Sequence, residues 1–361
     1  MKTKSDQLRE IVTNSVNTND YHCVKQMILE NELTFIEKHH LEDYFLVAHE
    51  IMTELKKNEN VLIGPGWDWM IGSHVCRSLG ITNLNPSDLG ITPIITWGND
   101  NYRPTITIEV DCESYDFVLK KVAENTKNIE CRFLIQPSAI LSRIKHIQAQ
   151  IVKNGKDCPK LYDRLIWNED YELFMEGNFG GIPLFDDKDI LKLTNILLTS
   201  RQYGAFDELL NVQGLLDSNA THIFKNDASI ESFRQTHGVL SVLGKNLFPW
   251  GFLFKEDVAW FLNGWIGLSW KQCAQVIEYA DTNAESEANY LKQIYLHQGI
   301  DSGFREEELC FIWNSLFKRT VKKTLPSKAH YSGRVYLSVF LARLKHQFPE
   351  EFKQALEKYS D

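Results

Sequence analysis

The sequence is short of several features that would narrow its function at once. Its seven cysteines are scattered and form no CxxC pair, so reduced thiols are expected and a structural zinc site is not. No apolar run approaches the roughly 20 residues that span a bilayer. The first ten residues lack the apolar core of a secretory signal, and repeats and low-complexity tracts are missing too. These absences predict a cytoplasmic protein with no membrane partner.

Positive charge is also in short supply. Against 39 Lys and Arg stand 48 Asp and Glu, which gives a formal net charge of −9 at pH 7. This excess of acid argues against a protein dominated by non-specific nucleic-acid binding and favours a protein partner. One basic stretch, residues 318–345, keeps nucleic-acid contact open, although an ordinary solvated helix face is an equal interpretation. Its candidate phosphate contacts are Lys318, Arg319, Lys322 and Lys323.

The 361 residues have the composition of a globular protein, with 43% hydrophobic and 24% charged residues. Strand and helix patterns alternate at first, and helix patterns dominate later, so we expect an α+β protein with a helix-covered mixed sheet. The loop at 154–160 predicts a division into residues 1–155 and 156–361. Helices are expected over residues 5–38, 41–57, 70–79, 116–124, 138–153, 187–199, 205–217, 229–243, 255–264, 269–280, 285–297, 304–318 and 332–357.

Residues 103–116, RPTITIEVDCESYD, show the alternation of a half-buried strand. The polar face of this strand carries Thr105, Thr107, Glu109, Asp111 and Glu113. Carboxylates at i and i+2, about 6.6 Å apart along a strand, hold paired magnesium ions in many phosphoryl-transfer enzymes. Glu109 and Asp111 have that spacing and are candidate metal ligands. The alternative, and the simpler one, is a solvent-exposed strand end that enters a turn.

A glycine-rich turn, Gly64-Pro65-Gly66, follows a predicted strand at 61–63 and precedes the predicted helix at 70–79. Free backbone N–H groups at such a junction bind anions. A plain tight turn explains the same residues.

Seven segments in the right order resemble the palm and fingers of the alpha subunit of bacterial replicative DNA polymerase III, the family C polymerases. YFLVAHEIMTELKKNENVLIGPG is similar to the helix before the family's GPGRGSxxGS loop. RPTITIEVDCESYDFVLKKV is similar, without a gap, to the metal strand MPDxDxDFxxxxRDxVIxYV and its following helix. The other segments are LGITNLNP, ELFMEGNFGGIPLFDD, FDELLNVQGLLDSNA, PWGFLFKED and PSKAHYSGRVYLSVFLARLKHQFPEEF. The resemblance implies a nucleotidyltransferase-like palm of the polymerase beta type, followed by mainly helical fingers.

The same resemblance implies that the family's metal-binding acids are lost. Its two magnesium-binding aspartates fall on Thr105 and Thr107, and the third falls on or beside Arg132. A neutral hydroxyl is a poor ligand for a hard divalent cation, and an arginine would repel it. Only the more peripheral acid is kept, as Glu109. No catalytic residue and no cofactor are therefore expected, and Mg²⁺ would bind only if a carboxylate site had moved to Glu109 and Asp111.

The family's nucleotide-binding positions are partly kept. In the loop, Trp67, Asp68 and Trp69 replace the small residues and the arginine that would admit a triphosphate, and Asp217 replaces the arginine of RPGPL. The positions that remain as nucleotide-binding candidates are Gly64, Gly66, Gly72, Ser73, Lys255, Lys328 and His330. Only 22 residues separate Glu109 from Arg132, where the family inserts its thumb, so the resemblance implies a thumbless palm plus fingers.

Three functions follow from these observations. The first is a catalytically inactive, polymerase-derived binding or scaffold module in DNA metabolism or a related multi-gene system. The second is an active nucleotidyltransferase whose carboxylate site has moved to Glu109 and Asp111. The third is a nucleotide sensor that binds at residues 64–73 without chemistry. The first is favoured, because losing the acids removes the charge stabilisation on which phosphoryl transfer depends.

Overall fold

The computed structural model describes residues 2–15, 23–91, 104–127, 132–162, 174, 180–185, 190, 194, 205–217, 252–317 and 324–358. The chain divides into two compact units. The first consists of Met1–Leu209 and Ala329–Asp361, and the second of Leu210–Lys328. This division follows compactness. The predicted boundary near residue 155 separates a palm-like from a fingers-like domain, and it stays a prediction.

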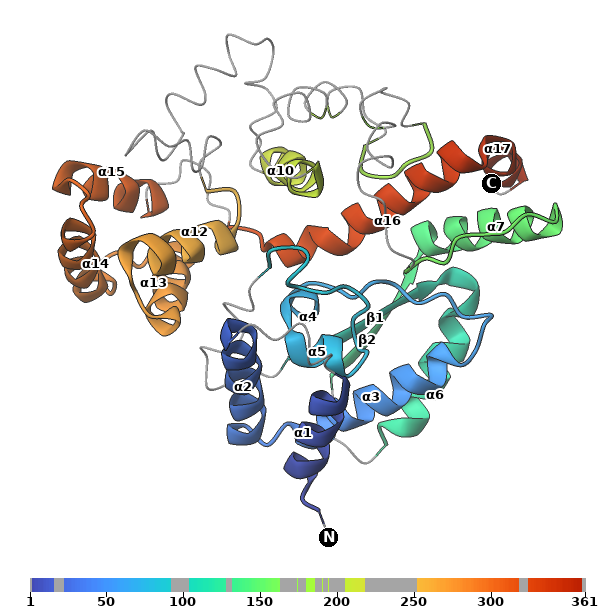
Figure 1. Ribbon diagram of the computed structural model, residues 1–361, viewed down its shortest axis with the longest axis horizontal. Coiled ribbons are helices and arrows are strands. Elements are labelled where there is room, and N and C mark those ends of the chain that lie inside the picture. The colour runs from blue at the N-terminus through green and yellow to red at the C-terminus, as the bar shows by residue number, and fades with distance from the viewer. Residues whose placement is uncertain are drawn as a thin grey trace. The chain divides into compact units, whose positions relative to one another are not determined.

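The first unit contains a small parallel sheet (Figure 1). Strand β1 (Ile106–Asp111) pairs with β2 (Phe133–Ser138), with Ile106 opposite Phe133. Ile63 adds an antiparallel bridge to Val110 on β1. Between the strands, the 3₁₀ turn η2 (Cys112–Ser114) and helix α6 (Tyr115–Asn125) form the described part of the crossover. The α+β class is confirmed, while the mixed sheet and the palm assignment stay predictions.

Helices pack around this sheet and supply most of the core. They are α1 (Lys4–Ser15), α2 (Cys23–Lys38), α3 (Glu42–Lys56), α4 (Trp69–Gly72), α5 (His74–Ser78), α7 (Ala139–Lys153), α16 (Lys328–Gln347) and α17 (Pro349–Lys358). Figure 1 shows α3 and α6 side by side next to the strands, and α7 beside α17. Because the sheet has only two strands and a bridge, the surrounding helices must bury most of the apolar surface.

Helix α3 shows why the sequence folds this way. Its apolar residues recur every three or four positions and are buried as one stripe: Tyr44, Phe45, Ala48, Ile51, Met52 and Leu55. Each large side chain in that stripe stabilises the fold by about 1.5–3 kcal/mol. Acidic residues in the first turn and Lys56 in the last complement the helix dipole. The predicted helix at 41–57 is confirmed.

Tyr44 fixes where both strands begin. Its hydroxyl accepts the Ile106 N–H at 2.8 Å and lies 2.7 Å from the carbonyl oxygens of Pro104 and Arg132. Pro104 precedes β1 and Arg132 precedes β2, so one buried hydroxyl from α3 ties the two strands to the same helix. The register of the sheet is thus set partly by a side chain outside it.

The second unit is helical in its described part. It contains α12 (Lys255–Phe261), the π-helical turn η5 (Leu262–Ile266), α13 (Trp270–Thr282), α14 (Asn289–Asp301) and α15 (Glu306–Phe317). Helix α10 (Ala205–Asp217) spans the border between the units in sequence. Ser269 and Gln272 form a capping box that begins α13, and Asn283 with φ +56° ends it. The predicted helices in this part are confirmed to within a few residues.

Three local predictions were wrong. The helix expected at 70–79 is broken at Ser73, which adopts an extended conformation between α4 and α5. The strand expected at 61–63 is a single bridge. The helix expected at 332–357 is two helices, because Pro349 begins α17 after Phe348. The helix expected at 229–243 lies outside the described residues, as does most of the one at 187–199.

Candidate functional site

The polar face of β1 is buried, which corrects the expectation of a solvent-exposed strand end. All six residues of β1 are buried; Thr107 is 8% exposed, Glu109 6% and Asp111 0%. A buried carboxylate must be paired, hydrogen-bonded or protonated. What surrounds Glu109 and Asp111 therefore decides whether they could bind a metal.

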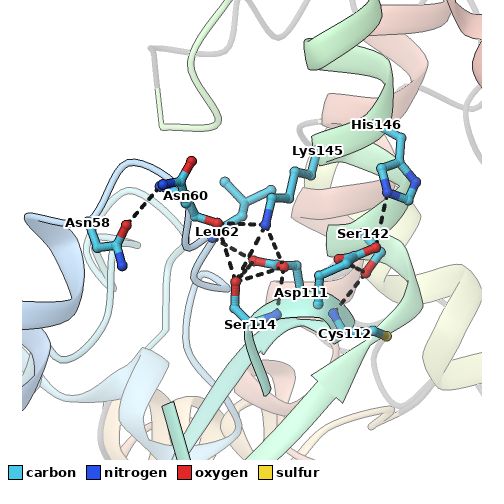
Figure 2. Close-up of polar contacts among 10 residues, drawn as sticks. Asn58, Asn60, Leu62, Asp111, Cys112, Ser114, Ser142, Lys145 and His146 are labelled. Atoms are coloured by element: carbon cyan, nitrogen blue, oxygen red, sulfur yellow. Dashed lines mark hydrogen bonds and ion pairs between the residues drawn. The ribbon is translucent and has the colours of Figure 1, made fainter. Parts of the chain in front are cut away.

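Asp111 is held by a network of groups from three segments, namely residues 60–62, the η2 turn and α7 (Figure 2). Its carboxylate accepts the Leu62 N–H at 2.7 Å and the Ser114 hydroxyl at 2.9 Å, and lies 2.7 Å from the Lys145 ammonium. Lys145 also donates to the Asn60 carbonyl at 2.6 Å. Burial raises the pKa of Asp111, but Lys145 and the other donors outweigh it and leave the pKa below its ordinary value. This carboxylate binds β1 to α7 and to the 60–62 segment.

Glu113 follows in the turn after β1 and contacts α7. One of its oxygens accepts the Ser142 hydroxyl at 2.9 Å, and the other lies 3.0 Å from His146 Nε2. Ser142 in turn accepts the Cys112 N–H at 2.8 Å. The carboxylate lies between hydroxyl and imidazole, whereas nucleophilic catalysis needs the imidazole between the other two. We assign this arrangement to packing of the turn on α7.

Glu109 points towards the glycine turn and α16. A Cβ on Gly64 would lie 2.7 Å from Glu109 Oε2, so the carboxylate fills the space that this glycine leaves. Burial raises the pKa of Glu109, and a hydrogen bond from Ser138 and the charge of Arg334 only partly counter it. Because this burial disfavours the charged form, Glu109 is a weaker ligand for Mg²⁺ than an exposed glutamate would be.

The glycine turn is packed against its neighbours. The Gly64 N–H donates to the Glu109 carbonyl at 2.8 Å, and the Pro65 carbonyl accepts the Thr82 hydroxyl at 2.6 Å. Gly66 has φ +120°, and a Cβ there would lie 2.6 Å from Thr82 Oγ1. These glycines are needed for close packing, which favours the tight-turn interpretation of this segment.

Helix α16 lies against the same turn. A Cβ on Gly333 would lie 2.9 Å from the Gly66 carbonyl oxygen. On the same helix, the Arg334 guanidinium lies 4.6 Å from the centre of the Trp67 ring. The centre of the His330 ring lies 5.8 Å from the centre of the Trp67 ring. The Trp67 indole thus stacks on an arginine of α16. The structure therefore brings His330, Gly64, Gly66 and Glu109 together.

Gly72 and Ser73 belong to a different arrangement. Both are buried, and the Ser73 hydroxyl caps α5 by accepting the Cys76 N–H at 3.0 Å. The same hydroxyl hydrogen-bonds Glu32, whose carboxylate also accepts the His74 N–H at 2.9 Å and the Val75 N–H at 3.2 Å. The amides at this junction are occupied by a carboxylate of the chain itself. This explains why the predicted helix breaks at Ser73.

The positions at which the resemblance places the family's aspartates lie at the start of the sheet. Thr105 immediately precedes β1, and its carbonyl accepts the Trp69 indole N–H at 3.1 Å. Arg132 immediately precedes Phe133, the partner of Ile106, and is exposed. Thr107 is one pair further along the sheet. The two segments that the resemblance identified as metal strands are thus adjacent parallel strands, but they present two hydroxyls and a guanidinium at these positions.

The remaining candidate lysines are paired with carboxylates. Lys255 lies 2.8 Å from Asp281, and Lys328 lies 3.1 Å from Asp257 and 5.7 Å from the centre of the Phe254 ring. The nucleotide-binding assignment for these residues stays a prediction. The candidate phosphate contacts Lys318, Arg319, Lys322 and Lys323 lie outside the described residues.

The sequence did not predict which charged residues pair with the candidate site residues. Lys145 and Glu32 were assigned no role, and Arg334 was only one member of a basic stretch. Lys145 could have been suspected, because a helix that follows a parallel strand packs back on the sheet and brings its polar edge to the strand end. Glu32 gave no signal, since nothing in its own segment distinguishes it from a surface residue.

The described residues contain neither a metal-holding cluster nor a membrane-spanning helix. No group of three or more His, Cys, Asp or Glu residues there is placed to hold a metal ion. Within the same described ranges, no helix is long and apolar enough to cross a membrane. The metal assignment for Glu109 and Asp111 stays a prediction, and the partners of Asp111 weigh against it.

One family model matches the N-terminal part of the chain. Residues 2–130, just over a third of its length, match the family of the bacterial DNA polymerase III alpha NTPase domain. The match includes the glycine turn and β1, and it supports a relationship to bacterial DNA polymerase III alpha. No protein of curated function matches the chain.

Proposed function

We propose that this protein is a catalytically inactive relative of DNA polymerase III alpha that acts by binding, as a module or scaffold in DNA metabolism or a related multi-gene system. The observation that carries the proposal is the placement of Thr105, Thr107 and Arg132 at the start of adjacent parallel strands. Two-metal phosphoryl transfer needs anionic oxygens there, because the metals stabilise the attacking and leaving oxygens. Two hydroxyls and a guanidinium supply none.

The internal pairing of the remaining charges supports the same proposal. Asp111 is bound by Lys145, and Lys255 and Lys328 each lie beside an aspartate. A group that acts on a substrate must be able to exchange its partner for that substrate. Each of these groups would have to break an ion pair first, so we assign them to stability.

The proposal includes the finer architecture suggested by the sequence. It describes a palm in residues 1–155 and fingers in 156–361, without a thumb. A thumbless palm would grip duplex DNA poorly, and a net charge of −9 adds repulsion from phosphates. We therefore favour a protein partner over nucleic acid, in the cytoplasm.

The alternative that keeps chemistry is a transferase using Glu109 and Asp111. It would require Asp111 to release Lys145 and Glu109 to ionise in a buried position that disfavours its charged form. The alternative that keeps nucleotide binding would require the turn at residues 64–66 to open, since its backbone is already bonded to Thr82 and Glu109. No observation favours either over the inactive binding module.

A transfer assay tests the proposal. The full chain is incubated with labelled nucleoside triphosphates, Mg²⁺ or Mn²⁺, and primed DNA, RNA or protein acceptors. No metal-dependent transfer of label is expected. Transfer that disappears in Glu109→Gln and Asp111→Asn but persists in Glu124→Gln, an exposed position on α6, would replace the proposal with the displaced transferase.

Nucleotide sensing is tested separately by the fluorescence of Trp67 and Trp69 and by thermal stability at millimolar nucleotide. No change in either is expected. A saturable change that is lost in Trp67→Phe would favour the sensor.

A further inference from the structure

Residues 252–317 of the second unit carry an excess of acidic side chains, whereas the whole unit, residues 210–328, is nearly balanced with 13 Asp and Glu against 12 Lys and Arg. Residues 252–317 contain ten Asp and Glu against four Lys and Arg, so this segment holds a large share of the chain's excess acid. Three of the four cations lie beside carboxylates of the same segment: Lys255 at Asp281, Lys292 at Glu285 and Arg305 at Glu308. The acids that are exposed are Glu278, Glu287, Asp301, Glu306 and Glu307. The exposed charge of residues 252–317 is therefore mainly negative.

Aromatic rings lie next to part of this charge. Trp260, at 49% exposure, has its ring 6.2 Å from that of the half-buried Trp265. The Trp265 ring lies 6.4 Å from that of Phe304, which is buried and begins the turn into α15. Exposed Asp301 and Glu306 are three residues before and two residues after Phe304. An indole surface thus borders the acidic end of α14 and the acidic start of α15.

This combination suits one kind of occupant. Indole faces attract guanidinium and ammonium groups and also cover aliphatic stems, and carboxylates at their border pair with the same cations. Exposed tryptophans with a charged rim are typical of protein interfaces. We infer that the surface formed by Trp260, Trp265, Asp301, Glu306 and Glu307 binds a lysine- and arginine-rich segment of a partner protein. The inference rests on the proposed function, because it gives the binding module its partner class.

Nucleic acid is the class that this surface disfavours. Aromatic side chains do stack on bases, but proteins that use them add a cationic groove that follows the backbone. Here the bordering charges have the opposite sign, so phosphates would be repelled and salt would weaken the repulsion. A basic peptide shows the reverse, since salt screens its attraction to the carboxylates.

The test measures binding of the full chain to a short labelled peptide of alternating arginine and leucine. A second peptide has glutamate in place of arginine, and labelled single-stranded DNA is the third probe. Binding of the basic peptide alone is expected, and it should weaken as salt is added. Equal binding of the acidic peptide, preferred binding of DNA, or no binding of any probe would overturn the inference.

Matched variants locate the surface. Glu306→Lys with Glu307→Lys should weaken binding of the basic peptide by about tenfold, the change that 1.4 kcal/mol represents. Glu50→Lys with Glu124→Lys changes the net charge equally at exposed sites of the first unit and should have little effect. An equal loss in both pairs would show non-specific attraction and overturn the inference.

Trp260→Ser should weaken binding by a similar factor, whereas Tyr290→Ser, at 54% exposure on α14, should not. Circular dichroism of each variant confirms that it folds. Failure of this test leaves the inactive-polymerase proposal intact, and nucleotide transfer would overturn that proposal without affecting peptide binding.

Discussion

The ammonium group of Lys145 on α7 lies 2.7 Å from a carboxylate oxygen of Asp111 at the end of β1, and Asp111 is fully buried. This pair joins the strand that the resemblance identifies as the metal strand to the helix after β2. The other oxygen of the carboxylate accepts the Leu62 N–H. One side chain thus connects three segments of the first unit, and its loss should be felt in stability.

Lys145→Met should destabilise the first unit by roughly 2–4 kcal/mol, because it leaves a buried carboxylate without its cation. The pKa of Asp111 is below its ordinary value, so the pair contributes stability above about pH 4 that is lost as pH falls through the folded pKa. The deficit of the variant should therefore shrink in acid. Chemical denaturation at several pH values measures it.

Two controls accompany this prediction. Lys153→Met changes an exposed lysine of the same helix and should cost less than about 0.5 kcal/mol. The double variant Asp111→Asn with Lys145→Met should cost clearly less than the sum of the single variants. Additive losses would mean that Lys145 stabilises the fold by packing alone.

Glu32 should make stability depend on pH in the opposite direction. Burial raises its pKa to about 7, and the hydrogen bonds from Ser73, His74 and Val75 only partly offset this. A carboxyl whose folded pKa lies above its unfolded value binds more protons when folded, so its stability contribution falls as pH rises from about 4.5 to about 7. The loss over this range is roughly 3 kcal/mol.

Glu32→Gln cannot ionise and should flatten the pH dependence between these limits. Glu50→Gln, an exposed carboxyl on α3, should leave the dependence as it is. The measurement is the denaturant midpoint of the wild type and both variants from pH 4 to pH 8. Parallel curves for wild type and Glu32→Gln would show that folding does not raise the pKa of Glu32.

The pattern of residues predicted helices and strands well where one element was enough to determine them. The stripe on α3 and the alternation on β1 are local properties, and both elements form where expected. The partners of β1 could not be predicted in the same way. Asp111 was expected to face solvent because Lys145 is 34 residues away in the chain, and nothing in either segment announces the other.

The same reasoning applies to the break at Ser73. Residues 70–79 have the composition of one helix, yet Ser73 caps a new helix there because a carboxylate from α2 supplies the acceptor. The glycine turn is the opposite case. Its residues suggested either anion binding or tight packing, and only the distances to Glu109, Thr82 and Gly333 favour packing.

Three glycines separate the effects of conformation and of space. Gly66→Ala should be the most destabilising, by more than about 2 kcal/mol, since it combines φ +120° with a contact of 2.6 Å to Thr82. Gly90 has φ +60° but nothing near its Cβ position, so Gly90→Ala should cost about 1 kcal/mol. Gly264 has neither constraint, and Gly264→Ala should be neutral or stabilising. Thermal melts of the three variants should follow this order; a Gly66 variant as stable as the Gly90 variant would mean that the turn relaxes easily.

Restoring an acid on β1 should not restore a metal site. Thr107 is 8% exposed, so Thr107→Asp would bury a new negative charge. Arg132 precedes the neighbouring strand, but no described group of acids could hold a metal together with the new carboxylate. We expect destabilisation by about 2–4 kcal/mol at neutral pH, relieved in acid where the new carboxyl is protonated. Thr107→Val, nearly the same size, should cost less than about 1.5 kcal/mol.

Thermal stability with and without millimolar Mg²⁺ tests whether a metal binds the restored acid, because a bound metal would stabilise the folded state. A rise in melting temperature with Mg²⁺ in Thr107→Asp, absent in Thr107→Val, would show that the metal geometry survives and would reopen the case for catalysis.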